Sequence, residues 1–346
     1  MKRKFLALFL TAALAVSVTA CGSDDSKSTL APADTTIDAG QTEQNEEAER
    51  AKEETEKAKK EAEEAKKKAE EEVKKAEEEK AETENLIEEA LKRMAEVTGM
   101  KMQMVMNMDM SVEADGQKES AESVAIVDME CMTDPLKIKM EMEANLKVMS
   151  TGEEESEFVS VYADMDEDGN YMMYMSDGTI WFATPVSEFD LDEYNTMRSM
   201  EAQIGDTSGY VLEGTEKLNG ADVYKYSYTM TGDEMKEAIK NSGALGRLSS
   251  IGLSTNDAYS MLDGTGEIVT YVYVDAETYY IVQYEMDITE VIDALMGAVA
   301  EALREQGESY SLSVSKMEVV MTCSNYNGIS DITIPEEALS AKVVEY

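Results

Sequence analysis

Sulfur-bearing side chains are the residues of this chain whose types and spacing could do chemistry. The sequence holds 26 methionines and three cysteines but no histidine. Within residues 99–111 a methionine occupies every second position: Met100, Met102, Met104, Met106, Met108 and Met110. Thioether sulfur is a soft copper ligand, and the flexible methionine side chain also moulds around irregular apolar shapes such as an acyl chain. These methionines could therefore bind a metal ion, bind an apolar ligand or form an ordinary hydrophobic core.

The period of two predicts a β-strand. It places all six thioethers on one face of an extended chain and mostly polar groups on the other, whereas a helix would spread them around its circumference. Sulfurs along one strand face lie about 7 Å apart, so a copper site would need sulfurs from a second element, and we expect no metal site. Cores and apolar binding surfaces use the same residue types, so both interpretations stay open for this face.

An acidic run supplies a second candidate site. Asp164, Asp166, Asp168 and Gly169 match the first half of an EF-hand calcium loop, but Met175 stands where the loop needs a bidentate glutamate. An Asp-Gly hairpin explains the same residues. We therefore expect no calcium site.

Composition limits the remaining chemistry. The net charge of -42 would repel nucleic acid, so no nucleic-acid partner is expected. The lack of histidine removes the commonest general base, and no nucleophile elbow, phosphate loop, zinc motif or dinucleotide fingerprint occurs. We expect neither catalysis nor a cofactor. Cys131 and Cys323 lie on predicted strands and could be joined by a disulfide outside the cytoplasm.

The N-terminus reads as a secretory signal over residues 1–20. Three basic residues precede an apolar run that ends Val18-Thr19-Ala20-Cys21. This ending resembles the lipobox of bacterial lipoproteins, with an ordinary transmembrane or secreted start as the alternative. The resemblance implies cleavage before Cys21 and acyl chains, such as palmitate, on Cys21, which would anchor the chain to the extracytoplasmic side of the cell membrane of a monoderm bacterium.

Two non-globular segments follow. Residues 21–45 are rich in Ser, Thr, Asp and Gly and predict a flexible linker. Residues 46–85 are almost entirely Glu, Lys and Ala, with pairs such as Glu53 and Lys57 at favourable helical spacing. Because alanine buries little surface, this stalk is either a solvated single helix or a weak coiled coil that would allow self-association.

Residues 86–346 predict one β-rich domain. An apolar stripe predicts a helix over 86–97 that Gly99 terminates, and alternating patterns with Asp-Gly, Asn-Gly and Asp-Pro turns predict a long antiparallel meander. The remaining expected elements are a helix at 188–203, a short helix at 233–240, a loop at 242–266 that could act as a lid, a helix at 290–304, and closing strands at 309–323 and 329–334.

This order of elements resembles the LolA/LppX-like lipoproteins and related Gram-positive lipoproteins of unknown function. The helix 86–97 leading into 100–110, the Gly214–Thr229 hairpin, Val272-Tyr273-Val274-Asp275 and the closing Ile332–Glu337 carry the resemblance. It implies an α+β fold, a curved antiparallel β half-barrel with helices on its concave face, preceded by the charged helix. Known members bind a lipid or another apolar ligand on that face.

In this interpretation the domain binds or transfers an apolar, lipid-like ligand without catalysis. The expected ligand-binding residues are Met102, Met104, Met106, Met140, Met142 and Trp181. The alternative is a structural or sensory module of the cell envelope whose cavity is filled by its own side chains and which binds a protein partner.

Overall fold

The computed structural model describes residues 67–68, 86–114, 117–166, 169–186, 207, 209–232, 234, 266–305 and 310–344. Residues 24–85 and residues 86–346 fall into different compact units, and all the elements named below belong to the second. The predicted signal, Cys21, the linker and nearly all of the stalk lie outside the described residues. So do the predicted helix 188–203 and almost all of the segment 233–265.

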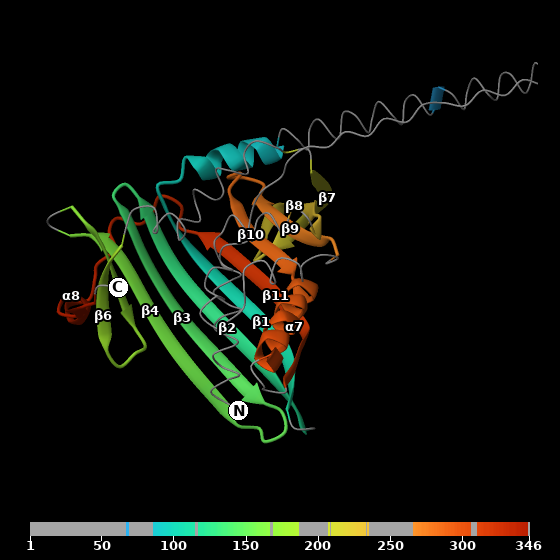
Figure 1. Ribbon diagram of the computed structural model, residues 1–346. Helices are drawn as coiled ribbons and strands as arrows, with labels where there is room; N and C mark the ends of the chain where they lie inside the picture. Colours follow the sequence, from blue (N-terminus) through green and yellow to red (C-terminus); the bar gives the residue numbers. More distant parts are fainter. Residues whose placement is uncertain are drawn as a thin grey trace, which may run out of the picture. The chain divides into compact units, whose positions relative to one another are not determined.

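The described residues form one twelve-stranded sheet in the order β12-β6-β5-β4-β3-β2-β1-β11-β10-β9-β8-β7. All neighbouring strands are antiparallel except β12 and β6, which are parallel. Figure 1 shows the sheet curving around the side that carries α7, and the expected half-barrel with a helix on its concave face is confirmed. The strands are β1 (Gly99–Ala114), β2 (Gln117–Thr133), β3 (Leu136–Val148), β4 (Glu154–Met165), β5 (Tyr171–Ser176), β6 (Trp181–Val186), β7 (Tyr210–Leu218), β8 (Ala221–Met230), β9 (Ile268–Asp275), β10 (Ile281–Asp287), β11 (Tyr310–Ser324) and β12 (Lys342–Val343).

Turn chemistry in the sequence explains several of the strand connections. Asn219 and Gly220 have φ angles of 51° and 92°, the left-handed pair that a two-residue type I′ hairpin needs between β7 and β8. Pairing of Ala114 with Gln117 likewise leaves two residues between β1 and β2. These short connections set the register of the flanking strands, and with it the face on which each side chain lies.

Helix α7 (Thr289–Glu305) packs along β11 (Figure 1). The Thr289 hydroxyl oxygen accepts a hydrogen bond from the Met317 amide at 2.7 Å, and the Asp293 carboxylate accepts one from the Val314 amide at 2.7 Å. These two amides flank the place where the β1–β11 register shifts, between Asp109 and Met110. At this irregularity the two β11 amides donate hydrogen bonds to side chains of α7 instead of to a neighbouring strand.

A first helix covers residues 86–95, as the apolar stripe predicts. Its buried residues, Ile87, Ala90, Leu91 and Met94, belong to the main hydrophobic core. Gly99, however, does not end this helix but begins β1. A Cβ atom at Gly99 would lie 3.2 Å from the Cys131 carbonyl oxygen, so its small size serves a close strand approach.

The C-terminal residues 325–344 form a strap. Tyr326 near its start packs against the main core, and the strap then crosses to the outer face of the sheet, opposite α7, where Ile332 and Ala338 are buried. At its start, the Asn327 side chain accepts a hydrogen bond from the Thr98 amide at 2.7 Å. The strap then contains the short helix α8 (Glu336–Leu339) and ends in β12 beside β6. The strand expected at 329–334 is wrong: this segment is irregular and packs by side chains.

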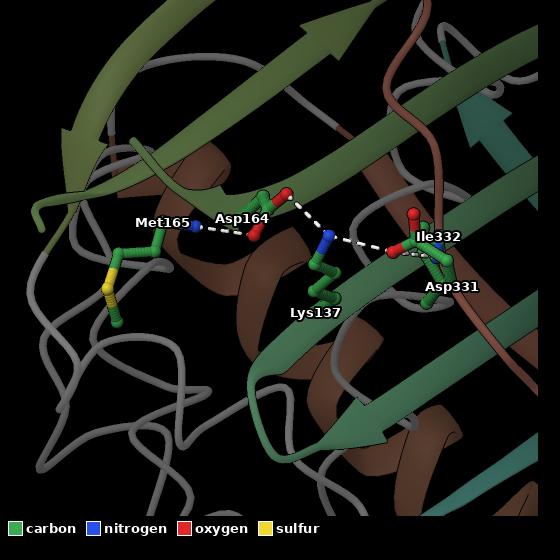
Figure 2. A network of polar contacts seen from close by, with 5 residues as sticks. All are labelled: Lys137, Asp164, Met165, Asp331 and Ile332. Atoms are coloured by element: carbon green, nitrogen blue, oxygen red, sulfur yellow. Dashed lines mark hydrogen bonds and ion pairs between the residues drawn. The ribbon is translucent and has the colours of Figure 1, made fainter. Parts of the chain in front are cut away.

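An ion-pair network fastens the middle of the strap (Figure 2). The Lys137 ammonium lies 2.8 Å from the Asp331 carboxylate of the strap and 3.1 Å from the Asp164 carboxylate of β4. The Asp331 carboxylate also accepts a hydrogen bond from the Ile332 amide at 2.9 Å. Lys137 therefore joins three chain segments, β3, β4 and the strap.

This network predicts a pH-dependent stability term. The hydrogen bond from Lys137, followed by that from the Ile332 amide, holds the pKa of the Asp331 carboxyl below its ordinary value of 3.8. A carboxyl with a lowered pKa stabilises the fold fully above its ordinary pKa, and that contribution is lost as the pH falls through the lowered value. Asp331→Asn should therefore reduce the unfolding free energy at pH 7 and reduce it less at pH 3, measured by urea unfolding.

Glu337→Gln, at an exposed position of α8, is the matched control and should have little effect at either pH. An equal loss for Asp331→Asn at pH 3 and pH 7 would show that the carboxylate charge contributes nothing to the attachment of the strap.

Candidate functional site

The inner face of the sheet, which α7 covers at β11, is the candidate site. All six alternating methionines of β1 lie on it, and each is between 0% and 8% exposed. The residues between them, such as Lys101 and Gln103, point to the opposite face and are exposed. The predicted two-faced strand is confirmed.

Strand register brings the five predicted methionines together. Met102 of β1 pairs with Met129 of β2, which pairs with Met140 of β3. The next row along the strands runs from Met104 through Val127 to Met142 in the same way. Met106 follows in the third row, opposite Ala125. These residues therefore make one continuous thioether-rich surface across three strands, in which Met140 and Met142 are 7% and 3% exposed.

Trp181, predicted to bind ligand with these methionines, does not join them in the structure. Because side chains alternate across a sheet, the pairing of Trp181 with Ser176 places both on the outer face. There Trp181 lies 5.9 Å, centroid to centroid, from the ring of Tyr162, in the cluster that the strap covers. A single tryptophan in a short strand gives no parity signal, because the register of β6 decides its face.

The possible disulfide between Cys131 and Cys323 is not formed in this structure. Both thiols are free and buried. Cys131 lies on β2 and Cys323 on β11, and β1 runs between these strands. Two strand spacings, about 9.6 Å, exceed the Cα separation that a disulfide can bridge. Burial raises the pKa of each thiol to about 12, so both stay protonated at neutral pH.

The acidic run at 164–169 has a structural role in its described part. Asp164 pairs with Lys137, and the Asp166 carboxylate accepts a hydrogen bond from the Asn170 amide at 2.8 Å. Asp168 lies outside the described residues. Within the part of the chain that the structure describes, no group of three or more acidic, cysteine or histidine side chains is arranged to hold a metal ion.

Two features of the inner face were missed by sequence reasoning. Tyr226 and Tyr284, 0% and 5% exposed, add phenol groups at its β8–β10 end. The same period-two count applied to Tyr224, Tyr226 and Tyr228 would have placed Tyr226 there. The second feature is that Cys323 of β11 pairs with Met102, which no count within one strand could predict.

A hollow of about 800 Å³ lies where β9, β10 and the start of α7 meet. Its lining includes the inner-face residues Ile268, Met286 and Val319 and the acidic residues Glu285 and Asp287. Among the described residues, this hollow brings apolar inner-face residues next to acidic ones.

None of the described helices is long and apolar enough to cross a membrane.

Residues 82–343 match the model of a family of unknown function, DUF6612, and the chain belongs to that family. No curated protein matches the chain. The family assignment covers the whole described sheet and assigns no activity to it.

Solved structures similar to the chain include the LppX-like proteins that the strand pattern predicts. The lipoprotein LppX of Mycobacterium tuberculosis is 12% identical over 73% of this chain and 99% of its own, with a TM-score of 0.36. LprF of Mycobacterium bovis is 13% identical over 75% and 98%, with a TM-score of 0.38. A DUF1329 family protein of Desulfovibrio piger is 12% identical over 75% and 98%, with a TM-score of 0.19.

The chain is thus similar to LppX-like lipoproteins, as the strand pattern predicts. Identities and TM-scores this low carry no information about ligands. The half-barrel description rests on the strand order and the curvature of the sheet itself.

Proposed function

We propose that the protein is an extracytoplasmic lipoprotein that binds or transfers an apolar, lipid-like ligand on the inner face, without catalysis. The observation that carries this proposal is the continuous thioether-rich surface across β1, β2 and β3. Methionine suits a surface that must accept several apolar shapes, because its unbranched side chain changes rotamer easily and its sulfur is polarizable.

Anchoring through Cys21 is part of the proposal. The sequence Val18-Thr19-Ala20-Cys21 supports it, and two or three acyl chains would hold the protein at a membrane far better than one. A linker and stalk of 64 residues between Cys21 and Leu86 (residues 22–85) would then place the ligand-binding domain away from the membrane surface. Self-association through the stalk would add avidity but is not needed for ligand binding.

One observation favours the second candidate, a self-filled module that binds a protein partner. Met102, Met104, Met106, Met140 and Met142 are at most 8% exposed. A face that is already covered either opens to admit a ligand or serves only as a core. The two functions therefore differ in whether an apolar molecule can reach these methionines.

Native mass spectrometry of the protein purified without detergent, followed by organic extraction, tests the proposal. A discrete added mass that extracts as lipid is the expected result, and it would identify the ligand class. A bare protein mass that stays unchanged after incubation with phosphatidylglycerol and diacylglycerol vesicles would reject ligand binding in favour of the self-filled module.

Photo-crosslinking locates the ligand. Protein produced with a photoreactive methionine analogue is irradiated with the same vesicles and then digested. We expect lipid adducts on peptides of β1 and β3, because their methionines form the proposed surface. Met149 and Met165, 50% and 42% exposed, are controls within the same chain. Adducts confined to the exposed methionines would indicate surface contact with vesicles and contradict the proposed site.

A further inference from the structure

Four sulfur atoms come from adjacent positions of two neighbouring strands. Met102 of β1 pairs with Cys323 of β11, and Met104 pairs with Met321 two residues further along the same strands. All four side chains belong to or pack against the main hydrophobic core, so they share the inner face. We call Met102, Met104, Met321 and Cys323 the sulfur block.

The geometry of a β-ladder lets these sulfurs meet. Directly opposite residues have Cβ atoms about 5 Å apart, and residues two apart on a strand are separated by about 6.8 Å. The centre of such a rectangle is about 4 Å from each Cβ atom. A methionine or cysteine side chain, together with the bond from its sulfur to a metal ion, can span that distance. The second element that a copper site requires is therefore β11.

The surroundings of the sulfur block favour a soft, singly charged ion. Met102, Met104 and Cys323 are 5%, 8% and 2% exposed, and Met321 is partly exposed. Thiolate and thioether ligands select Cu(I), whereas calcium and magnesium need oxygen ligands. Cu(I) binding would displace the Cys323 thiol proton to solvent. One thiolate with three thioethers would then bring a single negative charge to a single positive ion, so the bound site would be neutral in an apolar environment.

We propose that the sulfur block binds one Cu(I) ion through Cys323 and the thioethers of Met102, Met104 and Met321. Two further inner-face sulfurs, Met129 and Cys131, pair with Met102 and Met100 and lie on the far side of β1 from Cys323. Neither is needed for the site. This inference does not depend on lipid binding and stands or falls separately from it.

The matched comparison is a second block on the same two strands. Met108 pairs with Met317 and Met106 with Val319, so the spacing and burial are alike, but the cysteine is missing. Substitution there should leave Cu(I) binding unchanged. Any general affinity of buried methionines for copper would instead be lost equally from both blocks.

Anaerobic titration with Cu(I) in competition with bicinchoninate measures binding, in protein carrying Cys21→Ser and Cys131→Ser so that neither of the other two thiols can contribute. We expect one Cu(I) per chain, with all-sulfur ligation by X-ray absorption. Cys323→Ser and Met104→Leu should each weaken binding by at least the roughly 10–100-fold that supporting residues of metal sites contribute. Met108→Leu should have no effect.

Met104→Leu keeps the side chain apolar and similar in volume, so it tests the site even if Cys323→Ser impairs folding. Circular dichroism of each variant checks the fold. If the parent protein does not retain Cu(I), the proposal is overturned. Equal loss from Met104→Leu and Met108→Leu would overturn it as well.

Discussion

Replacing Met106 with alanine is expected to lower the unfolding free energy by about 2–5 kcal/mol, among the largest effects of any single truncation in this domain. Met106 is 0% exposed and lies between Val319 of β11 and Ala125 of β2. Neither neighbouring strand can fill the space left by the side chain without moving, because both are fixed by the ladder of the central strand β1.

Urea unfolding of the purified protein measures this loss of unfolding free energy. Gln103→Ala is the control on the same strand: its side chain is exposed on the outer face, where it donates a hydrogen bond to Asp128 at 2.8 Å. That change should stay within about 0.5 kcal/mol. A loss as small for Met106→Ala would mean that the inner face is loosely filled at this position, and it would strengthen the case for a ligand-accommodating surface.

The contrast between Met106 and Gln103 was predictable from the sequence because a period of two assigns each side chain to a face without knowledge of the strand order. The same holds for α7, where Val291, Ile292 and Leu295 follow helical spacing and are buried. The Asn219-Gly220 turn was predictable because few residue pairs adopt its backbone angles. Each of these features depends only on residues that are close together in the sequence, so it can be predicted without knowing the fold.

Register and strand order are not local, and they decide which parts of the candidate site come together. The sequence places Cys323 and Met102 on strands, but it does not state that β11 pairs with β1 across more than 200 residues of chain. It equally gives no reason to put Trp181 on the outer face or to separate Cys131 from Cys323 by β1. Each of these depends on long-range pairing, which packing of the complete sheet determines.

The strap was missed for a different reason. Ile332-Thr333-Ile334 alternates like a strand, yet it makes no ladder in the structure. Its apolar residues are used for packing on the outer face, where Tyr162 and Tyr174 present a surface of their own. Short alternating runs cannot distinguish pairing at a sheet edge from packing across a sheet face.

Replacing Ile332 with alanine should therefore have an effect similar in size to the loss of a core residue, about 2–5 kcal/mol. Ile332 is 4% exposed and packs with Tyr162, Tyr174 and Ala183 beneath the strap. Leu339→Ala, at a position of α8 that is 59% exposed, should remain within about 0.5 kcal/mol.

Hydrogen exchange adds a local test, because detachment of the strap should expose the amides of β12 and β6 before those of β1. Faster exchange throughout the sheet, with no lead at β6, would show instead that the strap and the half-barrel unfold as one cooperative unit.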